Sequence, residues 1–158
     1  MAQELAWSEA FAVGHAGLDE EHRALVAAIN AIHRHDDARQ PREQLEKLFA
    51  DLQALVSKHI AHEDEVMRMI VANVNSHESA ASVLHHHWLE HLDKHLDEHD
   101  RWVADLDAIV KRSLAQGGPA ADELQHWFFS HAVKSDAPLK SLFQATRQQY
   151  PKLIAQLS

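Results

Sequence analysis

Four stretches of the chain repeat apolar residues at spacings of three and four, the period of an amphipathic α-helix. The first runs from Leu18 to Ile32 and the second from Leu45 to Ile70. The third, from Trp88 to Ile109, has the most regular period, and the fourth runs from Leu124 to Val133. The pattern predicts an all-α fold in which four helices bury their apolar lines against one another.

Residues at the ends of these stretches predict where the helices begin and end. Asp19 can cap the first helix, Pro41 suits the first turn of the second, and Asp122 opens the fourth. The polar stretch 73–82 predicts the turn between the second and third helices. The run Gln116-Gly117-Gly118-Pro119 predicts a firm end to the third helix.

The rest of the chain divides into an arm and a tail. Residues 1–18 follow no helical period and predict an irregular N-terminal arm. Pro138 ends or kinks the fourth helix, because proline lacks the backbone N–H that the helix needs. Residues 139–158 then predict a helical C-terminal tail, interrupted near Pro151. We interpret the 158 residues as a single domain.

Charge and cysteine content narrow the class of protein. The chain has 24 acidic and 15 basic residues, a formal charge of -9 and no cluster of lysine or arginine, so nucleic acid and anionic membranes are poor partners. Without cysteine there is no disulfide, iron–sulfur cluster or thiolate metal site. No segment is apolar for the roughly 18 residues of a membrane span, and the first residues lack a secretory pattern. We therefore expect a cytoplasmic protein.

Polar residues interrupt the apolar lines of the second and third helices at four positions: His59, Glu63, His95 and His99. A buried, unpaired carboxylate or imidazole is costly, by several kcal/mol for a charge. A metal ion removes this cost, because it binds carboxylate as an anion and imidazole as a neutral donor. For any one of these histidines alone, the alternative is a hydrogen-bonded core network or a helix face in contact with water.

Together, five imidazoles and two carboxylates form one patch on each predicted helix. The patches are His22, His59 with Glu63, His95 with His99, and His131 with Asp136. Within a patch, a spacing of four or five residues places the two donors near one helix face. Facing helices of a bundle project such ligands into a common core, and a carboxylate can bridge two ions. The four patches predict a dinuclear metal site.

The third helix offers a choice of ligand pairs. Histidines recur at every fourth position from His87 to His99, so any adjacent two could be the ligands. His95 and His99 lie on the apolar line of the helix and are the predicted pair. His91 lies beside that line, and His91 with His95 is the main alternative.

Four motifs in chain order resemble the hemerythrin family, specifically its single-domain bacterial members, over roughly residues 7–138. The motifs are Leu18-Asp19-Glu-Glu-His22, His59-Ile-Ala-His-Glu63-Asp64-Glu-Val-Met67, His95-Leu-Asp-Glu-His99-Asp-Arg-Trp102 and Trp127-Phe-Phe-Ser-His131-Ala-Val-Lys-Ser-Asp136. One departure is His15, which stands where the family commonly has isoleucine.

The resemblance implies an up-down-up-down four-helix bundle that holds two non-heme iron ions joined by an oxo or hydroxo group. It assigns His95, His99 and His131 to one iron, His22 and His59 to the other, and Glu63 and Asp136 to both. It further implies that dioxygen binds reversibly at the iron with two histidines, for carriage, storage, delivery or sensing. The alternatives are a di-iron enzyme acting on peroxide or nitric oxide, and a histidine-rich metal-handling protein.

More residues separate Met67 from His95 than the resemblance implies. In an antiparallel hairpin the excess lengthens the second and third helices at one end, by about eight residues or about 12 Å each. We expect the tail, residues 139–157, to pack against this extension. His77 and His85–His91 would line the same end, as solvated surface histidines or as a second, weaker metal site.

Overall fold

The computed structural model describes residues 3–38, 40–75, 77–117 and 119–157, and every regular element in these ranges is helical. In chain order the elements are the 3-10 helix η1 (Glu9–Phe11), α1 (Ala16–Ala38), α2 (Arg42–Asn73), α3 (Ser79–Gln116), α4 (Ala121–Phe129), the π-helix η2 (Ser130–Ser135), α5 (Ala137–Gln149) and α6 (Pro151–Leu157). The prediction of an all-α fold is confirmed. None of the helices described is both long enough and apolar enough to span a membrane.

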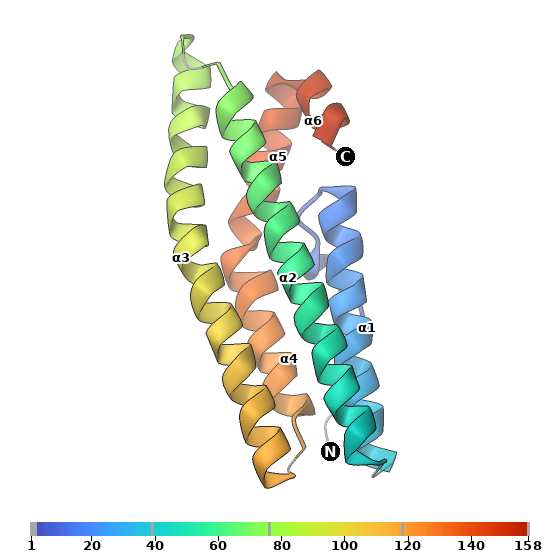
Figure 1. Ribbon diagram of the computed structural model, residues 1–158. Coiled ribbons are helices and arrows are strands. Elements are labelled where there is room, and N and C mark those ends of the chain that lie inside the picture. The colour runs from blue at the N-terminus through green and yellow to red at the C-terminus, as the bar shows by residue number, and fades with distance from the viewer. Residues whose placement is uncertain (1–2, 39, 76, 118, 158) are drawn as a thin grey trace.

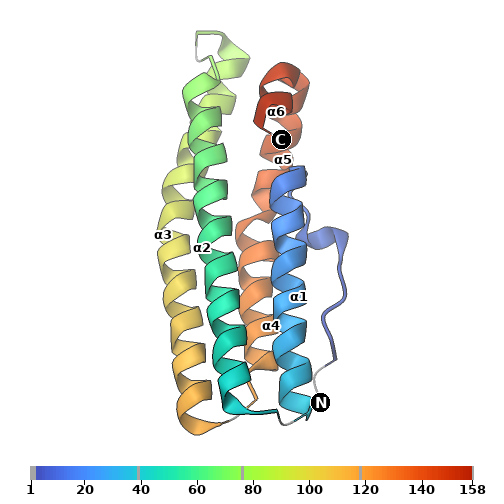
Figure 2. The same ribbon diagram turned by 45° about the vertical axis from the view of Figure 1, so that its right-hand side comes forward.

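The long helices lie side by side as a bundle. α1, α2 and α3 pack beside a fourth column in which α4, η2 and α5 follow one another (Figures 1 and 2). Two apolar clusters fill the interior. One contains Phe49, Leu106 and Leu124, and the other contains Met67 and Trp88. Burial of these apolar lines supplies most of the stability of such a bundle, because isolated helices are marginal in water.

The N-terminal arm is shorter than predicted. Because α1 begins at Ala16, the prediction that Asp19 caps this helix is wrong. Asp19 instead lies in the first turn, where its carboxylate accepts a 2.7 Å hydrogen bond from the backbone N–H of Val13. Farther along, the side chain of Asn30 pairs with both backbone groups of Leu5, at 2.8 and 2.9 Å. These bonds hold the arm against α1.

The predicted turn 73–82 is longer than the observed one, because α3 already begins at Ser79. The other predicted helix ends agree with the structure to within one or two residues. Pro41 directly precedes α2 instead of lying in its first turn, and Asp122 is the second residue of α4. α3 ends at Gln116, as predicted. The next residue, Gly117, adopts a φ of 66° and donates its N–H to the carbonyl of Ser113 at 2.8 Å. Glycine reaches this left-handed conformation without steric cost.

The fourth column changes helix type where it carries its polar patch. Pro138 lies in the first turn of α5 and has no N–H for the carbonyl four residues earlier, so the α-helical hydrogen bonds of the fourth column are interrupted before it. Residues Ser130–Ser135 form a π-helix, in which the N–H of Asp136 bonds to the carbonyl of His131 at 3.1 Å. The hydrogen bonds of a π-helix join residues five apart, which widens the turn and brings His131 and Asp136 toward the same face. The helix resumes as α5.

The C-terminal tail packs on the extended end of the bundle, as expected. The α2–α3 hairpin extends beyond the first turn of α1, and α5 and α6 stand beside the extension (Figures 1 and 2). Phe143 is fully buried and Ile154 is 3% exposed, in the same cluster as Trp88. The Trp88 Nε1–H also donates a 2.8 Å hydrogen bond to the hydroxyl of Thr146. Both contacts join α3 to the tail.

His15 joins the tail to the start of α1. Its Nδ1 accepts the N–H of Leu18 at 3.3 Å, so Nε2 carries the proton and donates to the carbonyl of Leu157 at 2.8 Å. Isoleucine could make neither bond. We also expected the tail to cover Val74, Val83 and Leu84 of the α2–α3 hairpin. Val74 and Leu84 are buried, but the expectation is wrong for Val83, which is 57% exposed.

Candidate metal centre

All seven predicted metal ligands are buried in the middle of the bundle, between the two apolar clusters. His99 is the most exposed, at 2%. They come from every column of the bundle: His22 from α1, His59 and Glu63 from α2, His95 and His99 from α3, His131 from η2, and Asp136 at the start of α5. Each residue continues an apolar line of its helix, so packing of the helices alone turns these side chains inward.

The donor atoms converge into two groups. Within each group the atoms lie within 4.8 Å of one another, and the groups are His22, His59, His131 and Asp136, and Glu63, His95, His99 and His131. His131 belongs to both, because its ring lies between them. The described part of the chain contains no third group of this kind, including around His77 and His85–His91, where a second metal site was the alternative.

The two carboxylates lie between the histidines of the two groups. Glu63 Oε2 is 3.0 Å from Nε2 of both His95 and His99, and 3.8 Å from Nε2 of His59. Asp136 Oδ2 is 3.2 Å from His22 Nε2, and its Oδ1 is 3.2 Å from His95 Nε2. Each carboxylate therefore contacts histidines of both groups, which is the arrangement that a bridging ligand requires.

Three of the histidines are held by hydrogen bonds from the ring nitrogen that faces away from the centre. Nδ1–H of His22 donates to the backbone carbonyl of Phe11 at 2.5 Å, and Nδ1–H of His59 donates to Glu21 at 3.3 Å. Similarly, Nδ1–H of His99 donates to Asp64 at 2.9 Å. These bonds fix the tautomer, so the lone pair of each Nε2 points into the centre.

When the histidines are neutral, as metal ligands must be, the interior of the centre holds acceptors without donors. Nε2 of His22 and Nε2 of His59 lie 3.3 Å apart, although each carries a lone pair in the tautomer fixed by its Nδ1 bond. Glu63 Oε1 and both oxygens of Asp136 have no bond of hydrogen-bond geometry with any residue described. Buried acceptors left in this state are costly, and a cation between them removes the cost. The donor set therefore fits metal ions.

The charges of the centre also suit metal binding. Burial would raise the pKa of Glu63, but the imidazoles of His95 and His99 hold it well below its usual range. Burial would likewise lower the pKa of His95, yet the carboxylates of Asp136 and Glu63 raise it to about 10. Burial lowers the pKa of His131 to about 3, so this imidazole stays neutral. Without metal, protons on the histidines balance the buried carboxylates; cations can take their place.

Aromatic rings close the centre against solvent. Trp102 stacks on the ring of His131 with centroids 3.8 Å apart, and Trp127 stacks on Trp102 at 4.2 Å. Phe128 meets His22 edge-on at 6.0 Å. These side chains are at least 96% buried. They keep water away from the donor atoms, which strengthens electrostatic interactions inside the centre.

His91, the alternative ligand on α3, lies outside both donor groups. Its ring stacks on that of His95 with centroids 4.9 Å apart, and it contacts neither carboxylate at ion-pair distance. His95 and His99 instead both reach Glu63. The geometry supports the predicted pair.

We therefore expect His99→Leu to lower iron content, because no neighbouring residue can replace its nitrogen as a donor to the metal ion beside Glu63. His91→Leu should leave iron content and the absorption spectrum of the iron-loaded protein nearly unchanged, since leucine can still pack on His95. Iron analysis and absorption spectroscopy of the two purified variants test the assignment. The reverse pattern would move the ligand pair one helical turn toward the N-terminus.

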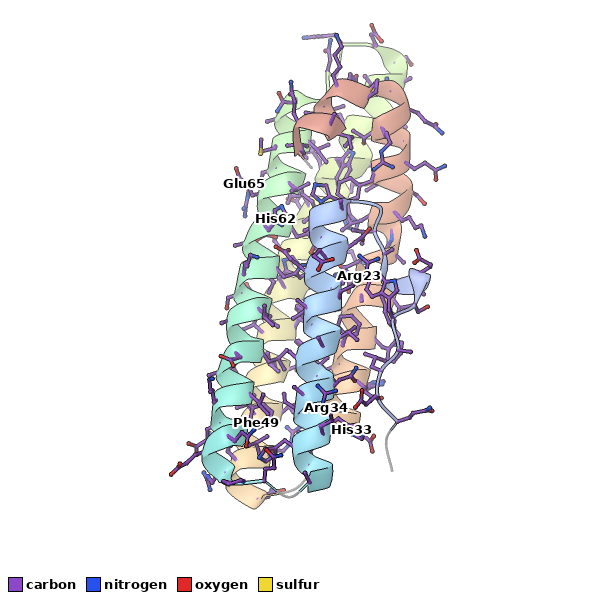
Figure 3. All side chains as sticks on the ribbon, turned by 90° about the vertical axis from the view of Figure 1, so that its right-hand side faces the viewer. Arg23, His33, Arg34, Phe49, His62 and Glu65 are labelled. Carbon is purple, nitrogen blue, oxygen red and sulfur yellow. The ribbon has the colours of Figure 1, made fainter. Side chains whose placement is uncertain are left out.

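Three groups that hold the histidines were not predicted as site residues. The Phe11 carbonyl gives no signal in the sequence, because any residue has one. Glu21 and Asp64 each directly adjoin a predicted ligand, which was the available signal. Glu21 also accepts a 3.0 Å bond from Nδ1 of His62, which lies on α2 beside the first turn of α1 (Figure 3). His62 thus supports the centre indirectly and is not a member of either donor group.

Comparison with known proteins agrees with this geometry. The family model described as "Hemerythrin HHE cation binding domain" matches residues 13–143, a span that includes all seven residues of the two donor groups. No match was found among the curated proteins or the solved structures. The family match covers most of the chain, and the chain belongs to the hemerythrin family.

Proposed function

We propose that this protein is a non-heme di-iron protein that binds dioxygen reversibly. A single observation carries the proposal: seven buried donor residues converge into two groups, and each of the two carboxylates contacts histidines of both groups. The bundle would have the up-down-up-down order, with α4, η2 and α5 together acting as its fourth helix. When bound, the two irons supply the two electrons that reversible dioxygen binding needs.

We assign the ligands as the family resemblance implies. One iron would be held by His95, His99 and His131, the other by His22 and His59, with Glu63 and Asp136 shared. His131 lies within reach of both groups, and the assignment to the first iron leaves the second with fewer protein donors. The open position for dioxygen would then lie on the His22 and His59 side, next to Phe128.

Several features of the chain favour reversible binding over turnover. The five imidazoles and two carboxylates differ from the set in di-iron carboxylate proteins, in which glutamates make up most of the ligands. The bonds from Phe11, Glu21 and Asp64 keep the imidazoles in place. The aromatic side chains restrict the access of water, and with it the protons that would carry the bound molecule on to further chemistry.

We expect the reduced, iron-loaded protein to be nearly colourless and to gain a visible absorption band in air. The band should disappear when oxygen is removed under argon and return on the next exposure, over several cycles. Absorption spectroscopy with a parallel oxygen electrode checks this. If air instead causes immediate, irreversible oxidation with continuing consumption of an added reductant, the protein is a di-iron enzyme.

A further inference from the structure

Histidines recur at every fourth position of α3 from His87 to His99, a row called here the histidine ladder. Two of them, His87 and His91, take no part in the metal centre and face a hollow in the surface. The hollow has a volume of about 430 Å³ and lies between α3 and the start of α5. Its polar lining from α3 consists of His87, Glu90, His91 and Lys94. His87 and His91 are four residues apart, so their side chains lie on the same face of the helix, one turn from each other.

The ladder runs from solvent into the metal centre. His87 is exposed, His91 is half-buried, and His95, one turn further on, is fully buried. The His91 ring stacks on that of His95, and His91 Nε2 is shielded from solvent without a hydrogen-bond partner among the residues described. A shielded imidazole nitrogen without a partner is costly unless a proton donor or a cation reaches it. A single ring thus separates the hollow from a predicted ligand.

The hollow also adjoins the start of α5, directly after the predicted ligand Asp136. Pro138 lines it from α5, two residues after Asp136. The regular helical ladder is interrupted at this point, between η2 and α5. An ion that leaves the hollow past His91 would therefore meet His95 and Asp136 first. Their facing atoms are 3.2 Å apart.

The charges around the hollow permit a cation. Lys94 is the one cationic side chain among the residues that line it, and its ammonium lies 3.5 Å from the carboxylate of Glu98. Glu90 adds a negative charge at the rim, where it also contacts His86 at 3.3 Å. The whole chain has a formal charge of -9, which attracts divalent cations from solution.

We propose that His87 and His91 form a transient binding site through which ferrous ions load into the metal centre, passing from His91 to His95. The proposal rests on the proposed function only in requiring that the centre binds metal. Two imidazoles one turn apart can share a divalent ion. No third donor joins them within coordinating distance among the described residues, so the ion is held weakly. Weak binding is what transfer requires, because an ion bound tightly at an intermediate site would not move on.

The test measures the rate of metal uptake by the metal-free, full-length protein. Ferrous ion is mixed anaerobically with the wild type, His87→Gln and His91→Gln, and uptake is followed by tryptophan fluorescence. Trp102 reports on the centre because its ring stacks on His131. Final iron content is measured after equilibration. The matched controls are His86→Gln, on the same helix but outside the hollow, and His126→Gln, an exposed histidine on α4.

The expected result is uptake several-fold slower in both His87→Gln and His91→Gln, with final iron content equal to that of the wild type and normal rates in both controls. Unchanged rates in the two variants would overturn the proposal. So would an equal loss of rate in the controls, which would indicate a general effect of surface histidines. A lower final content in His91→Gln would also overturn it, because His91 would then be a ligand of the centre.

His87 is exposed, so replacing it leaves folding intact and keeps the test decisive even if His91→Gln proves unstable. The proposed function fails differently. If the wild type binds no more than one ion at equilibrium, the dinuclear centre is wrong. If it binds two ions but does not bind dioxygen reversibly, the loading route remains as proposed.

Discussion

Replacing Asp136 with alanine is expected to give a folded chain that no longer retains a pair of iron ions. Both oxygens of this carboxylate lie 3.1–3.2 Å from imidazole nitrogens that belong to different donor groups. Its loss therefore removes a donor from both ions at once. His59→Ala removes a donor from only one group and should lower iron content toward half. Elemental analysis of freshly prepared, iron-supplied protein measures both effects.

Stability provides a second measurement of the same effect. A ligand that binds only the folded state stabilises it, by about 2.7 kcal/mol at a free concentration of about 100 times the Kd. Added ferrous ion should therefore raise the melting temperature of the wild type far more than that of Asp136→Ala. Asp122→Ala, which removes an exposed carboxylate, and His126→Ala, which removes an exposed imidazole on α4, are the matched controls. Wild-type protein with one ion or none would contradict the dinuclear centre, and so would full iron content in Asp136→Ala.

The convergence of the seven donors could be predicted because helical periodicity is a local property of the sequence. Once His59 and Glu63 lie on an apolar line, the same packing that buries Leu52 and Val66 must bury them. The choice of His99 over His91 as the partner of His95 followed from the same line, and in the structure the His91 ring stacks on that of His95 and lies outside both donor groups. The structure supports the ligand pair, although binding itself is still a prediction.

The pairing of His131 with Asp136 depended on something that the α-helical pattern does not contain. In a regular α-helix, residues five apart point in clearly different directions, since each residue turns the helix by about 100°. The π-helix that precedes Pro138 has a longer turn and removes this difference. Proline signals a break, but it does not specify a π-helix. The structure brings the two side chains together as expected, but through a helix type that the sequence pattern did not predict.

Contacts between distant segments account for what could not be predicted. Asp19 looks like a helix cap, but its carboxylate serves the arm, and α1 begins earlier. Glu21 and Asp64 hold histidines that are 38 and 35 residues away in the chain. Val83 differs from its buried neighbour Leu84 only in which side of α3 it occupies. The positions of Glu21 and Asp64 beside predicted ligands were a signal, but which histidines they hold depends on how the helices pack together.

Truncation after Lys140 is expected to lower the melting temperature by about 10–20 °C. The removed segment contains the buried Phe143 and Ile154 and the half-buried Leu142, Tyr150 and Leu153. A buried large side chain contributes about 1.5–3 kcal/mol, so the loss comes to roughly 5 kcal/mol or more. For a domain of this size, each kcal/mol corresponds to about 2–4 °C. The truncation also removes the hydroxyl that accepts the Trp88 hydrogen bond.

Point variants of the full-length chain test whether the packing of the tail, and not only its presence, stabilises the protein. Phe143→Ala in the full chain should cost about 3–5 kcal/mol by leaving a cavity against Trp88, whereas Gln144→Ala, at the next, exposed position, should cost little. Calorimetry and size-exclusion chromatography measure stability and association. All seven proposed ligands remain in the truncated chain, so a protein that still folds should retain its iron. An unchanged melting temperature in a monodisperse truncated protein would show that the tail does not stabilise the extended α2–α3 hairpin.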